Sequence, residues 1–157
     1  MESMSNAPYL LKRARSGYRV GHDTVFDHMM LDGLEDAYER GRPMGDFGEA
    51  VAAAYQFSRA DQDAFAMETL TRARSAAADG AFAAEIAPLT ISGKGGETVV
   101  DTDEHPMKVQ PERIPGLKPA FRPDGTITAA SASVNADGAA ALLLTTSAHA
   151  RAHGLPV

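Results

Sequence analysis

Apolar side chains recur every three or four positions between residues 22 and 40, which predicts a helix over this range. Asp23 or Thr24 is placed to act as its N-cap. The segment GRPMGD at 41–46 interrupts the pattern, because a proline disfavours helical geometry at the residue before it. A second helix is predicted over 47–56.

The strongest helical pattern follows Ser58. Asp61 stands three residues after this serine, as in a capping box, and apolar residues continue along one face beyond it. Gly80 closes the pattern, because glycine readily adopts the left-handed geometry that ends many helices. The first half of the chain is therefore predicted to be mainly helical.

The pattern changes in the second half. Residues 86–92 and 97–101 have the composition of two short strands joined by the glycine-rich turn GKGG. Residues 102–119 contain four prolines and show little periodicity, so we expect a long irregular connection there. Connections of this length inside a compact domain are usually functional.

The stretch TAASASVNADGAAALLL, residues 128–144, is small and polar for ten positions and then becomes apolar. Its small residues fit a loop, a tight packing seam or a backbone surface shaped for a ligand. The run at 139–145 is typical of a strand buried on both faces, and Ser147 is placed to cap a final helix. This order of elements predicts an α/β or α+β class.

The composition narrows the class of function. The net charge of −6 argues against a nucleic-acid binder, and no run reaches the roughly 18 apolar residues of a membrane span. The N-terminal segment lacks the apolar stretch of a signal peptide, so we expect a cytoplasmic protein with no membrane partner. The chain contains no cysteine, which excludes a disulfide, a thiolate metal site and a cysteine nucleophile within these 157 residues.

No residue pattern by itself predicts a catalytic centre. His149 and His153 are four positions apart, but no third ligand accompanies them, so we expect solvated histidines and no metal site. Ser131 and Ser133 lack the motif that surrounds a nucleophilic serine. The segment GKGGE at 93–97 lacks the spacing of a phosphate-binding loop and is expected to form a turn.

A basic segment, KRARSGYR at 12–19, holds four of the 15 basic residues. Both a solvated loop and a loop that contacts a partner or an anion fit this composition. The residue patterns alone therefore support a soluble α/β domain with a ligand surface.

Eight segments occur in the same order as in the thiolases, the acetyl-CoA acetyltransferase and 3-ketoacyl-CoA thiolase family. They are MESMSNAPYLL, LDGLEDAY, PMG, SRADQDAFA, VVDTDEHP, LKPAF, DGTITA and DGAAALLL. The resemblance covers essentially all 157 residues. The sequences of the segments GRPMG and IPGLKPAF are most similar to those of the short-chain, acetoacetyl-CoA type.

The resemblance implies a thiolase-fold fragment of α/β class. Residues 1–125 correspond to the loop domain that covers coenzyme A, and residues 126–157 to the strand and helix that return to the N-terminal core domain. The nucleophilic cysteine, the histidine and the second cysteine of the family lie outside the matched segments. The resemblance thus implies an internal segment without the catalytic residues.

The implied activity is acyl transfer in fatty acid metabolism. A thiolase condenses two acetyl-CoA molecules or cleaves 3-ketoacyl-CoA with a thiol, and it uses coenzyme A thioesters as substrates with no cofactor. The complete enzyme is expected to be a homodimer or homotetramer. A second hypothesis is a truncated, non-catalytic product that binds CoA weakly or not at all.

The resemblance also implies binding roles for individual residues. Leu34 and Met44 match the acyl and pantetheine pocket, whereas Pro43 stands where many relatives have histidine. Ser133 matches a serine whose hydroxyl bonds an amide of the pantetheine arm, and Asn135 replaces an apolar pocket residue. The full expected CoA-binding set, with no catalytic residue and no metal ligand, is Leu34, Met44, Lys108, Ala120, Phe121, Ala129 and Ser133.

Overall fold

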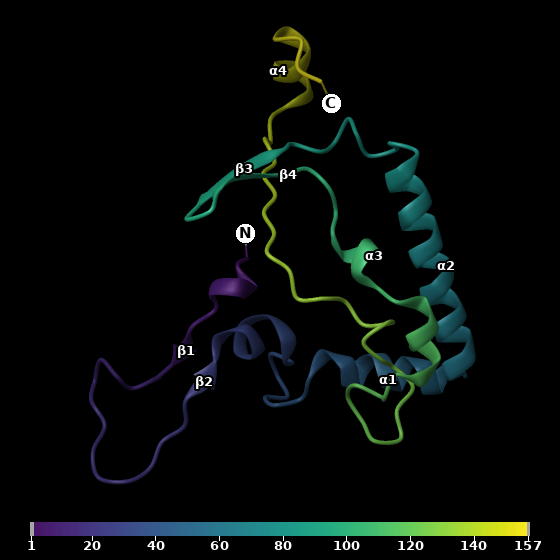
Figure 1. Cartoon of the computed structure of the whole chain (residues 1–157). Helices are drawn as coiled ribbons and strands as arrows, with labels where there is room; N and C mark the ends of the chain where they lie inside the picture. Colours follow the sequence, from purple (N-terminus) through teal and green to yellow (C-terminus); the bar gives the residue numbers. More distant parts are fainter. Residues whose placement is uncertain (1, 157) are drawn as a thin grey trace. The chain divides into compact units, whose positions relative to one another are not determined.

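A computed structural model describes residues 2–156, and the chain divides into two compact units (Figure 1). Unit 1 comprises Met1–Gly33 and Asn135–Val157, so it is built from both ends of the chain. Unit 2 is the continuous segment Leu34–Val134. Helices and short antiparallel strands both occur, in agreement with the mixed class that the sequence predicts.

Two helices form the framework of unit 2. The first, α1, spans Met44–Ala54 and begins three residues earlier than predicted, directly after Pro43, whose fixed φ suits the position before a helix. The second, α2, spans Arg59–Ala78 and is the longest element of the described chain. Gly80, with a φ of 69°, follows its C-terminal end, which confirms the predicted left-handed stop.

The predicted capping box at the start of α2 is present. The Ser58 hydroxyl accepts the Asp61 backbone N–H at 3.1 Å, and the Asp61 carboxylate accepts the Ser58 backbone N–H at 3.1 Å. The Ser58 hydroxyl also donates to this carboxylate at 2.6 Å. These bonds, first the hydroxyl and then the backbone N–H, lower the pKa of Asp61 below its ordinary value of 3.8.

Removing this cap should weaken α2. Ser58→Ala is expected to destabilise the chain by about 1 kcal/mol, the usual cost of losing an N-cap. Because the pKa of Asp61 is lowered in the folded chain, its contribution is complete above pH 3.8 and is lost as pH falls below that value through the folded pKa. Urea unfolding followed by helical circular dichroism at pH 7 and at acid pH tests both statements. Ser92→Ala, in an exposed strand, is the control. If S58A lost as much stability on acidification as the unmodified protein, the assignment of this pH dependence to the cap would be contradicted.

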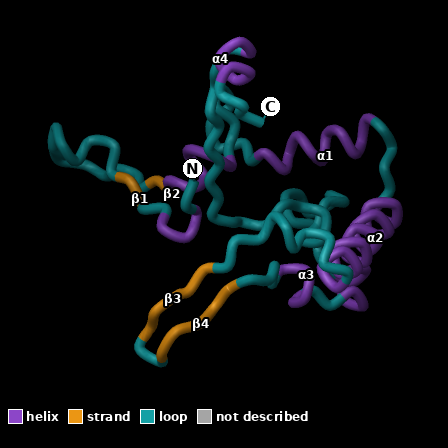
Figure 2. Tube along the Cα trace, turned by 90° about the horizontal axis from the view of Figure 1, so that it is seen from above, coloured by secondary structure: helices purple, strands orange, loops and turns teal. Residues whose placement is uncertain are grey.

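The predicted hairpin is also confirmed. Strand β3 (Leu89–Gly93) pairs antiparallel with β4 (Gly96–Val100), in a register that sets Leu89 opposite Val100 (Figure 2). Gly96 adopts a φ of 112°, which a side chain would disfavour, and this allows the tight turn. The GKGGE segment is therefore a hairpin turn, as expected.

The proline-rich connection is more ordered than predicted. It contains a short helix α3 (His105–Lys108) and a 3-10 segment η3 (Pro111–Gly116). Each has a proline in its first turn, where the missing N–H costs no hydrogen bond. Both segments contact α2. Prolines that suggest irregular structure in the sequence therefore begin short helical turns here.

The predicted helix over 22–40 is wrong in extent. Phe26–Asp27 instead forms strand β2, paired antiparallel with β1 (Tyr9–Leu10), and the Asp27 carboxylate accepts the Met29 backbone N–H at 2.9 Å. A helical turn follows, with π geometry over η2 (Met30–Leu34). The first part of the range is not helical because Phe26 and Asp27 pair with β1. The last part forms a turn, in which the Asp36 carboxylate accepts the backbone N–H groups of Tyr38 and Glu39.

Main-chain pairing joins the two segments of unit 1. Glu2 and Gly138 exchange both backbone hydrogen bonds, at 2.8 and 3.0 Å. The Asp137 carboxylate accepts the Ser5 backbone N–H at 2.9 Å, within the 3-10 turn η1 (Met4–Asn6). The bond from the Ser5 N–H is the main cause that lowers the pKa of Asp137. The DG pair of the small-residue stretch thus anchors the ESMS segment.

The predicted strand over 139–145 does not form within the described residues. Leu142, Leu143 and Leu144 are 88%, 86% and 91% exposed, and no ladder partner lies beside them between residues 2 and 156. A strand requires a partner for its N–H and C=O groups. The final helix α4 (Ser147–Ala152) does form, with Thr146 rather than Ser147 as the N-cap that accepts the His149 N–H.

None of the helices described in residues 2–156 is both long enough and apolar enough to cross a bilayer.

Candidate functional site

A cavity of about 490 Å³ lies in unit 2 between α2, the proline-rich connection and the small-residue stretch. One wall is the apolar side of α2, from Ala66 to Ala73. A second wall carries side chains that hold or can gain positive charge, namely His105, Lys108 and Arg113. The third wall is formed by Ala129, Ala130 and Ala132. An apolar side facing a cationic side suits a ligand with an apolar body and an anionic end.

The small-residue stretch forms a tight turn, and the three alanines of this wall belong to it. Thr128 is fully buried, and its carbonyl accepts the backbone N–H groups of Ser131 and Ala132 at 3.1 and 2.9 Å. The Thr128 N–H donates to the Ser131 hydroxyl at 3.1 Å, and the Ala130 N–H donates to the Thr128 hydroxyl at 3.2 Å. The stretch is thus both a loop and a surface of small side chains on a cavity. Ser131 has a structural role in it and does not stand as a free nucleophile.

A buried carboxylate holds the strand-like segment that precedes this turn. Glu49 of α1 is only 5% exposed, and it accepts the backbone N–H of Thr126 at 3.0 Å and of Ile127 at 2.9 Å. The Thr126 hydroxyl lies 3.3 Å from the same carboxylate. A side chain at Gly125 would overlap the Glu49 carboxyl group, so this position needs glycine. Glu49 therefore fixes the direction in which the small-residue turn begins.

Of the expected CoA-binding residues, Lys108 and Ala129 both line the cavity, and Ser133 directly follows Ala132 of its wall. Ala129 and Ser133 are exposed, and the Ser133 hydroxyl bonds no other described residue. The structure thus brings Lys108 to the same cavity as a segment that lies 21 to 25 positions further along the chain.

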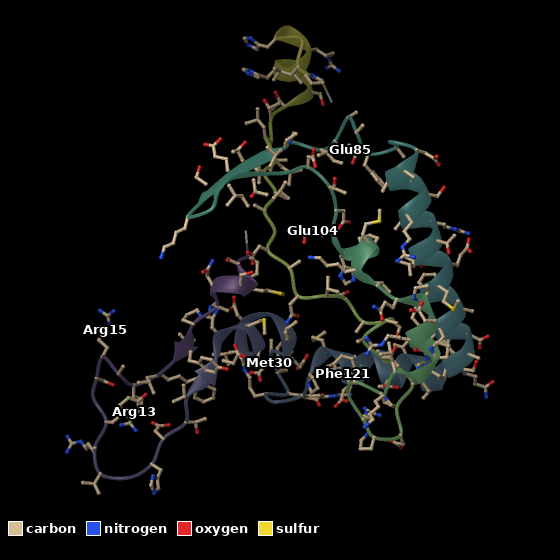
Figure 3. The ribbon with its side chains drawn as sticks, viewed as in Figure 1. Arg13, Arg15, Met30, Glu85, Glu104 and Phe121 are labelled. Carbon is tan, nitrogen blue, oxygen red and sulfur yellow. The ribbon has the colours of Figure 1, made fainter. Side chains whose placement is uncertain are left out.

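The remaining four lie along α1 and the adjoining backbone. The bridge between Glu35 and Pro43 brings together the segments that carry Leu34 and Met44. Phe121 packs so closely on the first turn of α1 that a side chain at Gly45 would enter its ring (Figure 3). The Ala120 N–H donates to the Ile127 carbonyl at 2.8 Å, beside a bridge between Pro119 and Thr128. This bridge joins the Phe121 segment to the turn that carries Ala129.

The electrostatics of the cationic wall include one internal ion pair. The Lys108 ammonium donates to the Glu104 carboxylate, an exposed pair at i and i+4. This hydrogen bond, followed by the Lys108 charge, lowers the pKa of Glu104 below its ordinary value of 4.5. Exposed ion pairs of this type contribute little to stability, so an anionic ligand can displace the carboxylate at small cost.

The sequence reasoning missed the residues that hold the wall in place. The Arg59 guanidinium binds both carboxylate oxygens of Asp63, at 2.9 and 2.8 Å, and donates to the Ile114 carbonyl at 3.0 Å. Arg74 donates to two further carbonyls of the same connection. His105 and Arg113 were also not expected at the site. Isolated arginines on a helix carry no motif that would have revealed these contacts.

The other candidates of the sequence lie away from this cavity. The rings of His149 and His153 contact each other, tilted by 38° with centroids 4.2 Å apart, and residues 2–156 contain no cluster of three or more metal-ligating side chains. The basic segment at 12–19 belongs to the long loop between β1 and β2, where the Lys12 ammonium lies 3.6 Å from the centre of the Phe26 ring. No ligand role follows from either feature.

Comparison with known proteins gives one consistent result. The family model described as "Thiolase, N-terminal domain" matches residues 1–148. An acetyl-CoA acetyltransferase of Pseudomonas aeruginosa is 45% identical over 158 residues, which cover 99% of this chain and 40% of that protein. A probable acetyl-CoA acetyltransferase of Dictyostelium discoideum is 44% identical over 155 residues, covering 98% of this chain and 37% of its own length.

The comparison with solved structures agrees with the comparison of sequences. The crystal structure of the Bacillus anthracis acetyl-CoA acetyltransferase superposes with a TM-score of 0.74 at 38% identity, over 84% of this chain and 33% of that one. The chain thus spans about two fifths of the curated relatives it matches, and over that part it has a thiolase fold. From the family match over residues 1–148 and this fold, the chain belongs to the thiolase family.

Proposed function

We propose that the protein carrying this chain is an acetyl-CoA C-acyltransferase, which condenses two acetyl-CoA molecules or cleaves a 3-ketoacyl-CoA, and that unit 2 binds the coenzyme A part of the substrate. Family membership supports the reaction class, because the matched relatives are named acetyl-CoA acetyltransferases. Coenzyme A thioesters serve as substrates, and no further cofactor is required. We also propose a homo-oligomeric, cytoplasmic enzyme.

The observation that carries the binding role is the cavity with one apolar and one cationic wall. Pantetheine is a narrow chain, and the alanines at 129, 130 and 132 leave room for it beside α2. The nucleotide end of coenzyme A bears phosphates, which the charges of Lys108 and Arg113 would attract. Ser133, with its hydroxyl free of other described residues, is placed to bond an amide of the arm.

Binding at a distance from the thioester contributes to the reaction by positioning it. Contacts with the non-reacting part of a substrate hold the reacting carbon in place and so reduce the entropy cost of the chemical step. The reacting thiolate of the proposed mechanism is supplied by sequence other than these 157 residues, which contain no cysteine. The proposed role of unit 2 is therefore recognition rather than proton or acyl transfer.

The experiment that tests this role places a larger side chain on a wall of the cavity. In the protein as encoded, Ala129→Leu is expected to raise the KM for acetoacetyl-CoA roughly tenfold, because the added side chain occupies space needed by the pantetheine arm. Steady-state thiolysis and calorimetric titration with coenzyme A measure the effect. Ala83→Leu, at an exposed position in the turn after α2, is the matched control. Equal KM values for A129L and the unmodified protein would contradict the placement of the arm.

A further inference from the structure

The short helix α3 depends on α2 for its position. A helix of four residues is not stable by itself, and its last carbonyl groups have no partner within it. Arg74 of α2 supplies the missing partners: its Nε donates to the Pro106 carbonyl at 2.9 Å and its Nη2 to the Val109 carbonyl at 2.6 Å. One half-buried guanidinium therefore ties both ends of the turn to α2.

These two carbonyl groups bracket Lys108 in the sequence. Pro106, Lys108 and Val109 all line the cavity, whereas Arg74 is not among its lining residues. Fixing the backbone on both sides of Lys108 limits the directions that its side chain can take. Within the described part of the chain Arg74 has no carboxylate partner, so its charge adds to the positive potential of the same wall.

Only an arginine can make this pair of bonds in full. The guanidinium presents donors in a planar fork, so two carbonyl groups 3 residues apart are bound with one fixed geometry. A lysine ammonium at the end of a flexible chain keeps the charge but does not fix two acceptors in this way. The contact thus specifies position as well as charge.

We infer that Arg74 is a positioning residue for the phosphate-bearing end of the substrate: it holds the turn that carries the Lys108 ammonium at the wall of the cavity. This inference rests on the proposed function. Arg74 acts through the turn, without touching the substrate. Its loss should therefore weaken recognition of the nucleotide part and leave the reacting end unaffected.

In the protein as encoded, two substrates distinguish an effect on recognition of the nucleotide part from an effect on the reacting end. Acetoacetyl-CoA contains the phosphates, and acetoacetyl-pantetheine lacks them. Arg74→Met keeps the apolar stem but removes both donors, and it is expected to raise the KM for acetoacetyl-CoA roughly tenfold with kcat unchanged, the scale of a lost charge-assisted bond. The kcat/KM for acetoacetyl-pantetheine should stay the same. Arg74→Lys should restore the CoA value only in part.

Controls on the same segment complete the test. Arg72→Met removes an exposed arginine of α2 that pairs with Glu68 at 2.7 Å, and it should change neither substrate's kinetics. Lys108→Met should give the same selective loss as R74M, and the double variant should lose little more, because both act on one contact. Because Lys108 is exposed, Lys108→Met also tests the inference if R74M folds poorly.

Equal losses of R74M with both substrates would overturn the inference, since they indicate a general structural role. Full recovery in R74K, or additive losses in the double variant, would overturn it as well. Absence of thiolysis with both substrates in the unmodified protein would instead refute the proposed function itself, and the inference with it.

Discussion

Residues 1–157 produced as an isolated polypeptide are expected to give no thiolysis of acetoacetyl-CoA. The proposed reaction transfers an acyl group to a cysteine thiolate, and this chain contains no cysteine. The Ser131 hydroxyl, next to the cavity wall, is bonded to the Thr128 backbone and has a structural role. Chromatographic detection of acetyl-CoA formed from acetoacetyl-CoA and coenzyme A measures the reaction directly.

The comparison for this result is the protein as encoded, assayed at the same concentration. Activity of the encoded protein together with none for residues 1–157 would assign the chemistry and the binding to different parts of the sequence. Turnover by residues 1–157 above the enzyme-free blank would show that the chain carries a nucleophile of another kind.

Glu49→Ala should cause the largest loss of stability among single substitutions in unit 2. The change removes the acceptor of the Thr126 and Ile127 backbone N–H groups and leaves both in a half-buried environment without a partner. Losing hydrogen bonds to a charged group, with donors left unpaired, costs about 3 kcal/mol. The amide hydrogens of Thr126 and Ile127 should exchange faster with solvent, which NMR detects residue by residue, and the urea midpoint of the helical signal should fall.

Two further variants separate this effect from a loss of charge. Glu85→Ala removes an exposed carboxylate of unit 2 and should change the midpoint little (Figure 3). Glu49→Gln keeps the size and one acceptor oxygen, but it removes the charge and replaces the second oxygen, which lies 3.0 Å from the Thr126 backbone nitrogen, by a donor, so an intermediate loss is expected. If E49A and E85A had equal effects, the buried carboxylate would not be the anchor described above.

Local signals in the sequence predicted the elements that depend on local contacts. The capping box of Ser58 and Asp61 and the stop at Gly80 identify α2, because their hydrogen bonds and backbone angles involve residues a few positions apart. The turn between β3 and β4 is also local. For the candidate site, Lys108 and Ala129 were selected only through the resemblance to thiolases; both line the cavity, and their role in binding coenzyme A stays a prediction.

The parts that failed depend on distant partners. Helical periodicity over 22–40 did not show that Phe26–Asp27 pairs with Tyr9–Leu10 across a long loop. The apolar run at 139–145 has strand composition, but none of residues 2–156 pairs with it as a ladder. Likewise, the carbonyl groups bound by Arg74 are 32 and 35 positions away in sequence. No spacing rule reports such contacts.

The pairing of Glu2 with Gly138 has a consequence for the order of folding. Ser5 and Asp137 are 132 positions apart, so unit 1 cannot close until the residues up to Gly138 have been synthesised. Unit 2 is continuous and can form its contacts earlier on the ribosome. Closing a long loop costs entropy that grows slowly with its length, by about 0.6 kcal/mol for each doubling. A unit 2 that is already folded shortens the flexible chain to be closed, so its folding makes it easier for the two segments of unit 1 to pair.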